Sequence, residues 1–131
     1  MKTIHLVLKV LLALVLLMPI FGALGIFPPP TRDLYTTDEA FAFIVLIMQS
    51  ASYITNLIAI VFAVSIVLLF TQREALAALL ILPITVNIVG FHTFLDGGLF
   101  ASGGMLAIVL VLLNLYFLWK NSSKYKILWK A

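Results

Sequence analysis

Cysteine is absent from this chain, and charged residues are scarce. Without cysteine the chain has no disulfide exchange, no thiolate metal site and no cysteine-ligated iron–sulfur cluster of its own. Only 10% of the 131 residues are charged, whereas a typical soluble domain has about 25%. A water-soluble globule of this length needs more polar residues to cover its surface. The composition therefore excludes an ordinary soluble domain.

Apolar residues dominate instead, at 64% of the sequence with a mean hydropathy of +1.23. Such a composition excludes a disordered chain. The uncharged runs cover residues 10–31, 40–72, 75–95 and 97–119. Each run reaches the roughly 20 residues that an α-helix needs to cross about 30 Å of hydrocarbon. We therefore predict an all-α polytopic membrane protein, a four-transmembrane-helix bundle forming one domain over residues 1–131.

The four crossings are expected at about residues 4–27, 53–70, 75–95 and 100–119. In the first crossing, Gly22 and Gly25 are small enough to let helices approach, so we expect them at packing sites. A proline run at residues 28–30 is expected to end this helix. Asn114, in the fourth crossing, is expected to hydrogen-bond between helices.

The run 40–72 is too long for one perpendicular helix, because at about 1.5 Å per residue it would reach about 50 Å. Thr37 followed by Asp38 and Glu39 is typical of a helix start. We expect a short interfacial or re-entrant helix at about residues 38–49, then a break near residues 50–52. One long tilted helix is the alternative.

Basic residues indicate the orientation. They are Lys2, Lys9, Arg32, Arg73, Lys120, Lys124, Lys126 and Lys130. Four crossings place all of them except Arg32 on the side that holds both ends of the chain, so the positive-inside rule places the N- and C-termini in the cytoplasm. A nucleic-acid-binding segment is another interpretation of the lysines in 120–130. The aromatic and apolar residues between them suit an anionic lipid surface better, so we expect a lipid bilayer and no nucleic acid as partner.

The first crossing also resembles a cleavable signal peptide, because Ala23, Leu24 and Gly25 follow its apolar stretch. That stretch is longer than the usual signal core of about 7–15 residues. Its removal would leave three crossings and divide the basic residues between both sides. We therefore expect the segment to remain as a membrane helix.

Polar residues within apolar helices need an explanation, because lipid makes them costly. His92 and Asp96 are four residues apart, so they share a helix face, with Thr85 deeper on that face and Asn87 on another. A histidine oriented by an aspartate can relay protons or hydrogen-bond a carbonyl such as a quinone head-group. The plainer interpretation is that both residues only terminate the helix at the water boundary.

A second polar cluster contains Gln49, Ser52, Tyr53 and Asn56. Spacings of three, four and seven would put these residues on one helical face. Opposite His92, such a face would build an outward-opening polar pocket. The alternative is hydrogen bonding between helices.

Other chemistries lack their residues. The two histidines, His5 and His92, fall on opposite sides of the predicted bilayer, and no carboxylate lies within a crossing, so we expect no metal site. Neither a nucleophile elbow nor a phosphate-binding glycine loop is present. We expect no covalently bound cofactor.

Residues 82–96 resemble a segment of the DoxX-like family of small four-helix membrane proteins. The matching residues are Pro83, Asn87, Phe91-His92 and Leu95-Asp96. Weaker matches are Tyr53 at the start of the second crossing, Arg73 in the following turn, and the ending at 115–125. The resemblance implies a bundle in the bacterial inner membrane. It also implies association with quinone-linked oxidoreductase, sulfur-oxidising or redox-stress complexes.

One position departs from the family pattern. Phe62 stands where the family commonly has a glutamate in the second crossing, and Ser65-Ile66 replace a glycine pair. With no cofactor for electron transfer, the chain is expected not to be catalytic by itself.

Our hypothesis is an accessory subunit of a quinone-linked or redox-stress oxidoreductase complex, with a protein partner in that complex. Its quinone-contact candidates are Asn87, His92, Asp96, Tyr53, Gln49 and Asn56. A small-molecule carrier and a purely structural membrane assembly factor are the alternatives.

Overall fold

The computed structural model describes residues 1–101 and 103–130, and this part of the chain is all-α with no strand. The prediction of an all-α fold is thus confirmed. The helices are α1 (Lys2–Ala23), η1 (Arg32–Leu34), α2 (Asp38–Ser50), α3 (Ser52–Phe70), α4 (Glu74–Phe94), α5 (Gly104–Lys120), α6 (Ser122–Tyr125) and η2 (Lys126–Trp129).

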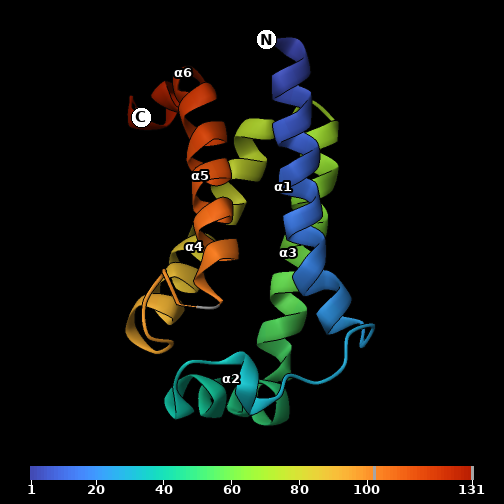
Figure 1. The fold of residues 1–131 in the computed structure, drawn as a ribbon. Helices are drawn as coiled ribbons and strands as arrows, with labels where there is room; N and C mark the ends of the chain where they lie inside the picture. The colour runs from blue at the N-terminus through green and yellow to red at the C-terminus, as the bar shows by residue number, and fades with distance from the viewer. Residues whose placement is uncertain (102, 131) are drawn as a thin grey trace.

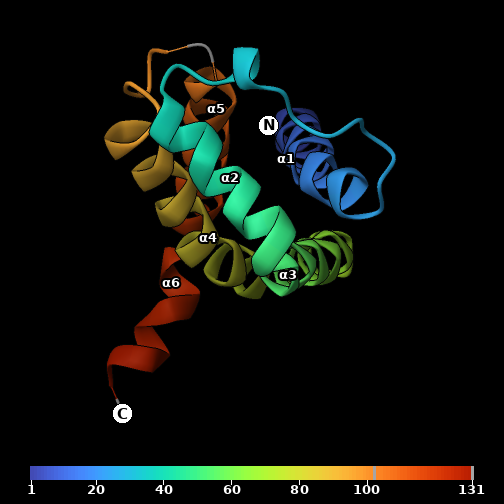
Figure 2. The same ribbon diagram turned by 90° about the horizontal axis from the view of Figure 1, so that it is seen from below.

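Four long helices, α1, α3, α4 and α5, run side by side as a bundle (Figure 1). Helix α4 packs against α3 and α5, and α1 packs against α3 and α5, which closes the ring of four. At one end, here called the α6 end, lie the start of α1 and the segment α6. At the other, the α2 end, helix α2 lies across the bundle rather than along it (Figure 2).

Three of the helices, α1, α3 and α4, are long and apolar enough to cross a membrane. The fourth, α5, meets the same test only together with α6 and η2, from which it is separated by a 66° bend. Apolar side chains are exposed on the outer faces of the bundle, among them Val7, Leu14, Ile60, Val67, Val86 and Leu112. So many exposed large apolar side chains are unusual for a soluble monomer and typical of a lipid-facing or partner-facing surface.

The long uncharged run 40–72 forms two helices, with a break at Ala51 (φ −137°, ψ 38°). Thr37 caps α2, since its side-chain oxygen accepts a hydrogen bond from the N–H of Ala40 at 3.1 Å. Asp38 and Glu39 occupy the first turn, where the helix dipole favours negative charge. A single continuous tilted helix is therefore not what this segment forms.

Helix α1 ends at Ala23, before the prolines, and not at residue 27 as expected. Gly25 has φ +73°, a left-handed conformation that glycine adopts without strain, and the N–H of Ile26 bonds back to the carbonyl of Phe21 at 3.0 Å. An added Cβ on Gly22 or Gly25 would meet nothing within 4 Å. Within this chain neither glycine is therefore a helix-packing site, contrary to expectation, and Gly25 ends the helix.

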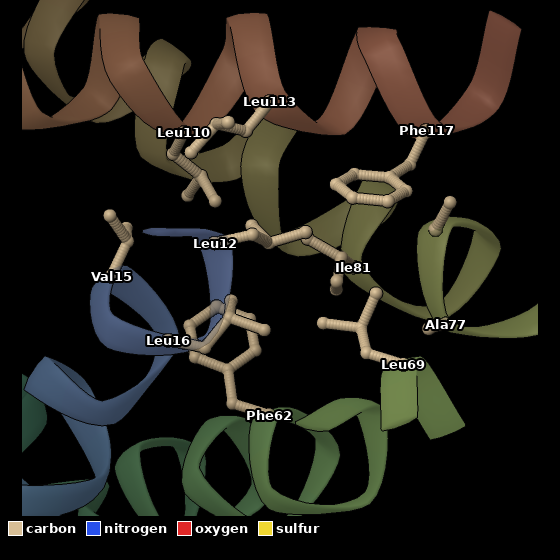
Figure 3. Close-up of a cluster of buried hydrophobic side chains, with 11 residues drawn as sticks. Leu12, Val15, Leu16, Phe62, Leu69, Ala77, Ile81, Leu110, Leu113 and Phe117 are labelled. Carbon is tan, nitrogen blue, oxygen red and sulfur yellow. The ribbon is translucent and has the colours of Figure 1, made fainter. Parts of the chain in front are cut away.

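The core lies between the four long helices (Figure 3). Its fully buried apolar side chains come from all four and include Leu12, Leu16, Phe62, Leu69, Ile81 and Phe117. Ala77 and Ala78 let α4 approach its neighbours, as small residues do in membrane bundles. Asn114 on α5 is buried and donates to the carbonyl of Ala78 at 3.0 Å, as expected of an interhelical hydrogen bond.

Candidate functional site

His92 and Asp96 form a pair at the α2 end of the bundle. His92 lies in the last turn of α4, and its Nδ1 is 3.0 Å from Oδ2 of Asp96. Asp96, two residues beyond the end of α4, has none of its surface exposed. The pairing agrees with their four-residue spacing, and Asp96 is enclosed by protein just beyond the helix end. Burial of a carboxylate is costly, so its hydrogen bonds must be accounted for.

The loop before α2 supplies the other partners of this corner. Oδ1 of Asp96 accepts the backbone N–H of Thr36 at 2.8 Å. The Thr37 hydroxyl donates to the carbonyl of Leu95, which is left free where α4 ends. Thr36 packs so closely on Gly97 that a Cβ at residue 97 would lie 2.8 Å from Thr36 Cγ2. With φ +80°, Gly97 also requires a conformation that other residues rarely adopt.

Aromatic rings surround the pair. Phe91 meets the His92 ring edge to face, with centroids 5.1 Å apart, and Tyr35 meets Phe91 at 6.3 Å. Burial raises the pKa of the Tyr35 phenol above its ordinary value, and the negative charge of nearby Asp96 raises that pKa further. The corner is therefore partly shielded from solvent.

A cavity of about 110 Å³ opens beside His92, between α1, α3, α4 and α5. Its other lining residues are almost wholly apolar and include Met18, Phe62, Ile88 and Leu106. Among the described residues that line it, His92 is the only titratable one. Since Asp96 engages Nδ1, the Nε2 atom is the ring nitrogen left for a ligand.

Gly103, the residue before α5, lies directly against the His92 ring. A Cβ added at Gly103 would lie 2.8 Å from Cε1 of His92 and 3.4 Å from Oδ2 of Asp96. Any larger residue would therefore push the ring or the carboxylate away. Gly103 was not among the site residues expected from the sequence. A glycine placed just before an apolar helix was the only available signal.

The remaining candidates lie elsewhere. Asn87 is exposed, and its side chain donates to the carbonyl of Pro83 one turn earlier at 2.9 Å. Gln49, Asn56 and Tyr53 are exposed too, with Tyr53 at 69%. None of these four residues lines the cavity.

The shared face predicted for the cluster at 49–56 does not exist. The break at Ala51 puts Gln49 on α2, while Ser52, Tyr53 and Asn56 are on α3. Helical spacing therefore does not relate Gln49 to the others, and the pocket expected from them is not built. Thr85, on α4, is buried and donates to the carbonyl of Ile81 at 3.1 Å, within its own helix.

A second polar network, missed by the sequence analysis, lies at the α6 end. His5 Nε2 is 3.0 Å from a carboxylate oxygen of Glu74, and His5 Nδ1 is 3.0 Å from the hydroxyl of Tyr116. Lys9 makes an ion pair with the same carboxylate and lies 5.9 Å from the ring centre of Phe70. The network joins α1, α4 and α5 and places Lys9 against α3. No local spacing reveals it, because its members are far apart in sequence.

Neither network is a metal centre. Across the residues that the structure describes, no group of three or more His, Cys, Asp or Glu side chains is arranged to hold a metal ion. His92–Asp96 is a two-residue pair, and Glu74 is already engaged by Lys9. The chemistry available at His92 is hydrogen bonding and proton transfer at one nitrogen.

Comparison with known proteins adds no assignment: no protein-family model, no curated protein and no solved structure matches this chain.

Proposed function

We propose that the chain is a multi-pass protein of the bacterial inner membrane in which α1, α3, α4 and α5 cross the bilayer. The apolar outer faces of these helices support this placement, since lipid is the solvent that they suit. The α6 end lies in the cytoplasm, where the positive-inside rule places Lys2, Arg73 and the lysines after α5. Helix α2 then lies along the outer surface of the bilayer.

In this membrane the protein acts as an accessory subunit of a quinone-linked or redox-stress oxidoreductase complex. The observation that carries this proposal is His92: among the described residues it is the one titratable side chain in the wall of an apolar cavity, and a fully buried Asp96 orients its ring. An apolar cavity with one placed polar group suits a ring-shaped ligand that needs a hydrogen bond. The resemblance of residues 82–96 to the DoxX-like family points to the same class of complex.

His92 can serve both redox forms of a quinone. When the ring is neutral with its proton on Nδ1, the Nδ1–H group donates a hydrogen bond to Asp96. Nε2 is then free to accept a hydrogen bond from a quinol hydroxyl. With both nitrogens protonated, the imidazolium is stabilised by the carboxylate and donates to a quinone carbonyl. Oxidation of a quinol releases two electrons and two protons, and the partner enzyme must take both electrons and one of the protons. This chain contributes binding, orientation and one proton acceptor.

The cavity limits the size of the ligand. Its volume of about 110 Å³ is below the roughly 150 Å³ of an engineered cavity that binds benzene. A quinone ring enters fully only when a wall moves, and Met18 is the most adaptable of the lining side chains. Phe62, at the position of the family's glutamate, fills space instead of supplying a second proton carrier.

The test is quinone binding by the purified protein in lipid nanodiscs, followed by photolabelling with an azido-quinone and competition by decylubiquinone. Replacing His92 with Ala should weaken competition about tenfold, the effect of losing one hydrogen bond of about 1.4 kcal/mol. Asn87→Ala is the matched control, because Asn87 is polar and on the same helix but exposed. Equal competition in the parent and the His92→Ala variant would sink the proposal. In a purified complex, the same change should slow quinone-dependent turnover.

A structural assembly factor is the second candidate, favoured by the small volume of the cavity. Under this function His92→Ala leaves quinone turnover of the complex unchanged, while loss of the whole subunit dissociates the complex. The carrier alternative lacks comparable support, since Gln49, Tyr53 and Asn56 do not line the cavity.

A further inference from the structure

The chain after α5 bends sharply at the α6 end. Helices α6 and η2 leave the direction of α5 by 66°. The hydroxyl of Tyr125 donates to the carbonyl of Ala75 at 2.8 Å, which fastens this segment to the start of α4. Figure 2 shows the segment extending sideways from the bundle, away from the start of α1. It therefore lies across the bundle axis, at the level where the bilayer surface is proposed.

An apolar groove separates the bent segment from α4. Its volume is about 280 Å³, and it is lined by Leu79, Tyr125, Leu128 and Trp129. Trp129 is 87% exposed and Leu128 is 65% exposed. The groove is well over twice as large as the cavity beside His92. Apolar side chains exposed beside such a groove indicate an apolar occupant.

Four exposed lysines lie in or next to the bent segment that forms one wall of the groove. The lysines of this segment are Lys120, Lys124, Lys126 and Lys130, and all four are exposed. The sequence has no acidic residue after Asp96, which lies at the opposite end of the bundle. The nearest carboxylate along the neighbouring helix, Glu74, is engaged by Lys9 and His5. Lys124 bonds to the neutral amide oxygen of Asn121 at 2.8 Å and keeps its charge.

We propose that this groove is a binding site for an anionic phospholipid. An acyl chain lies against Leu79, Leu128 and Trp129, and the head-group phosphate is bound by Lys126 and Lys130. An apolar groove wall in a segment that carries exposed lysines is complementary to both parts of such a lipid. The inference rests on the membrane placement of the proposed function and is independent of quinone contact at His92.

The exposed tryptophan provides the measurement. Trp119 and Trp129 are the only tryptophans, so a Trp119→Phe protein reports from Trp129 alone. It is reconstituted in vesicles of phosphatidylcholine containing brominated phosphatidylglycerol or brominated phosphatidylcholine, which quench tryptophan on contact. We expect the brominated anionic lipid to quench Trp129 with a several-fold higher relative affinity. That preference should decrease at high salt, because salt screens exposed charges.

The charge variant is Lys126→Gln with Lys130→Gln in the same background. Each lysine near an anionic surface is worth about fivefold in affinity, so the double variant should lose most of the preference. Lys2→Gln is the control: it removes a positive charge at the same end of the bundle, on α1, and should leave the preference unchanged. Both changes are at exposed positions, so folding is not at stake.

Three outcomes would overturn the inference. Equal quenching by both lipids shows that the groove does not select an anionic head-group. A preference that survives the double variant shows that these lysines do not bind the phosphate. Absence of quenching by either lipid shows that the groove is covered by protein. If the reconstituted protein binds no quinone but Trp129 still selects anionic lipid, only the quinone proposal fails.

Discussion

Asp96 accepts the backbone N–H of Thr36 at 2.8 Å, a contact between the loop that leads into α2 and the end of α4. The other oxygen of the same carboxylate pairs with His92. One buried side chain therefore both orients the candidate ligand-binding imidazole and fastens the segment that crosses the α2 end. Stability of the loop and orientation of the ring are linked through this residue.

Replacing Asp96 with Ala removes both hydrogen bonds and leaves the Thr36 N–H without its acceptor. Because hydrogen bonds to charged groups are worth about 1.5–3 kcal/mol, we expect about 3 kcal/mol of destabilisation. Amide hydrogen exchange in residues 31–37 should accelerate at least tenfold. His92→Ala is the control, since it keeps the Thr36–Asp96 bond, and exchange there should stay slow. Similar exchange in both variants would contradict the linkage.

Gly103→Ala tests whether the close approach of α5 sets the His92 ring. The new methyl would lie 2.8 Å from Cε1 of His92, so the ring must tilt away from its partner. We expect weaker quinone competition, by about fivefold or more, with His92 itself unchanged. Gly22→Ala is the matched control, because its added Cβ meets nothing within 4 Å. A silent Gly103→Ala would show that the ring position does not matter.

Comparing Phe62→Ala with Leu69→Ala tests whether ligand affinity depends on the size of the cavity and not on overall stability. Phe62 is 1% exposed and lines the cavity, so truncation should cost about 3–5 kcal/mol and enlarge the cavity. We expect tighter binding of para-benzoquinone, measured by calorimetry in detergent. Leu69→Ala is the control, because Leu69 is equally buried but does not line the cavity. It should destabilise by about 2–5 kcal/mol without changing affinity.

The ion pair of Lys9 and Glu74 should show coupling in a double-mutant cycle. Both side chains are only 15% exposed, so removing one partner leaves the other charge poorly solvated. We expect Lys9→Met and Glu74→Gln each to destabilise by about 2 kcal/mol, and the double variant by less than the sum. The exposed pair of Arg32 and Asp38 is the control and should couple by under about 0.5 kcal/mol. Thermal unfolding in detergent measures all variants.

We expect ionisation of Tyr35 to lower the free energy of unfolding at alkaline pH. Its pKa is raised in the folded protein by burial and by Asp96, so the folded state holds the phenolic proton to higher pH than the unfolded state. The stabilisation that this proton gives the folded state is fully present below about pH 10, the pKa of tyrosine in the unfolded chain. It is lost as pH rises through the folded pKa. Titration by ultraviolet absorbance, with Tyr35→Phe subtracted, should place this phenol last or nearly so. An ordinary pKa would contradict its burial.

Local features of the sequence were sufficient to predict the long helices, the start of α2 and the proximity of His92 and Asp96. The uncharged runs placed the long helices, and Thr37 with the acidic residues after it placed the start of α2. The four-residue spacing of His92 and Asp96 predicted that they lie close together, and they do, although α4 ends at Phe94 and Asp96 reaches His92 from the turn after the helix. These inferences hold because they depend only on neighbouring residues and on the length of an apolar run.

Only the tertiary structure decided which faces turn inward. Helices that are apolar all round have no contrast between a polar and an apolar face, so sequence periodicity does not fix their rotation. Asn87 and Tyr53 accordingly proved exposed, while Gly103 proved to lie against His92 and Phe62 to line the same cavity. The contacts of Asp96 with Thr36 and of Glu74 with His5 join distant segments. Such residues come together only when whole helices pack, so no local sequence pattern predicts these contacts.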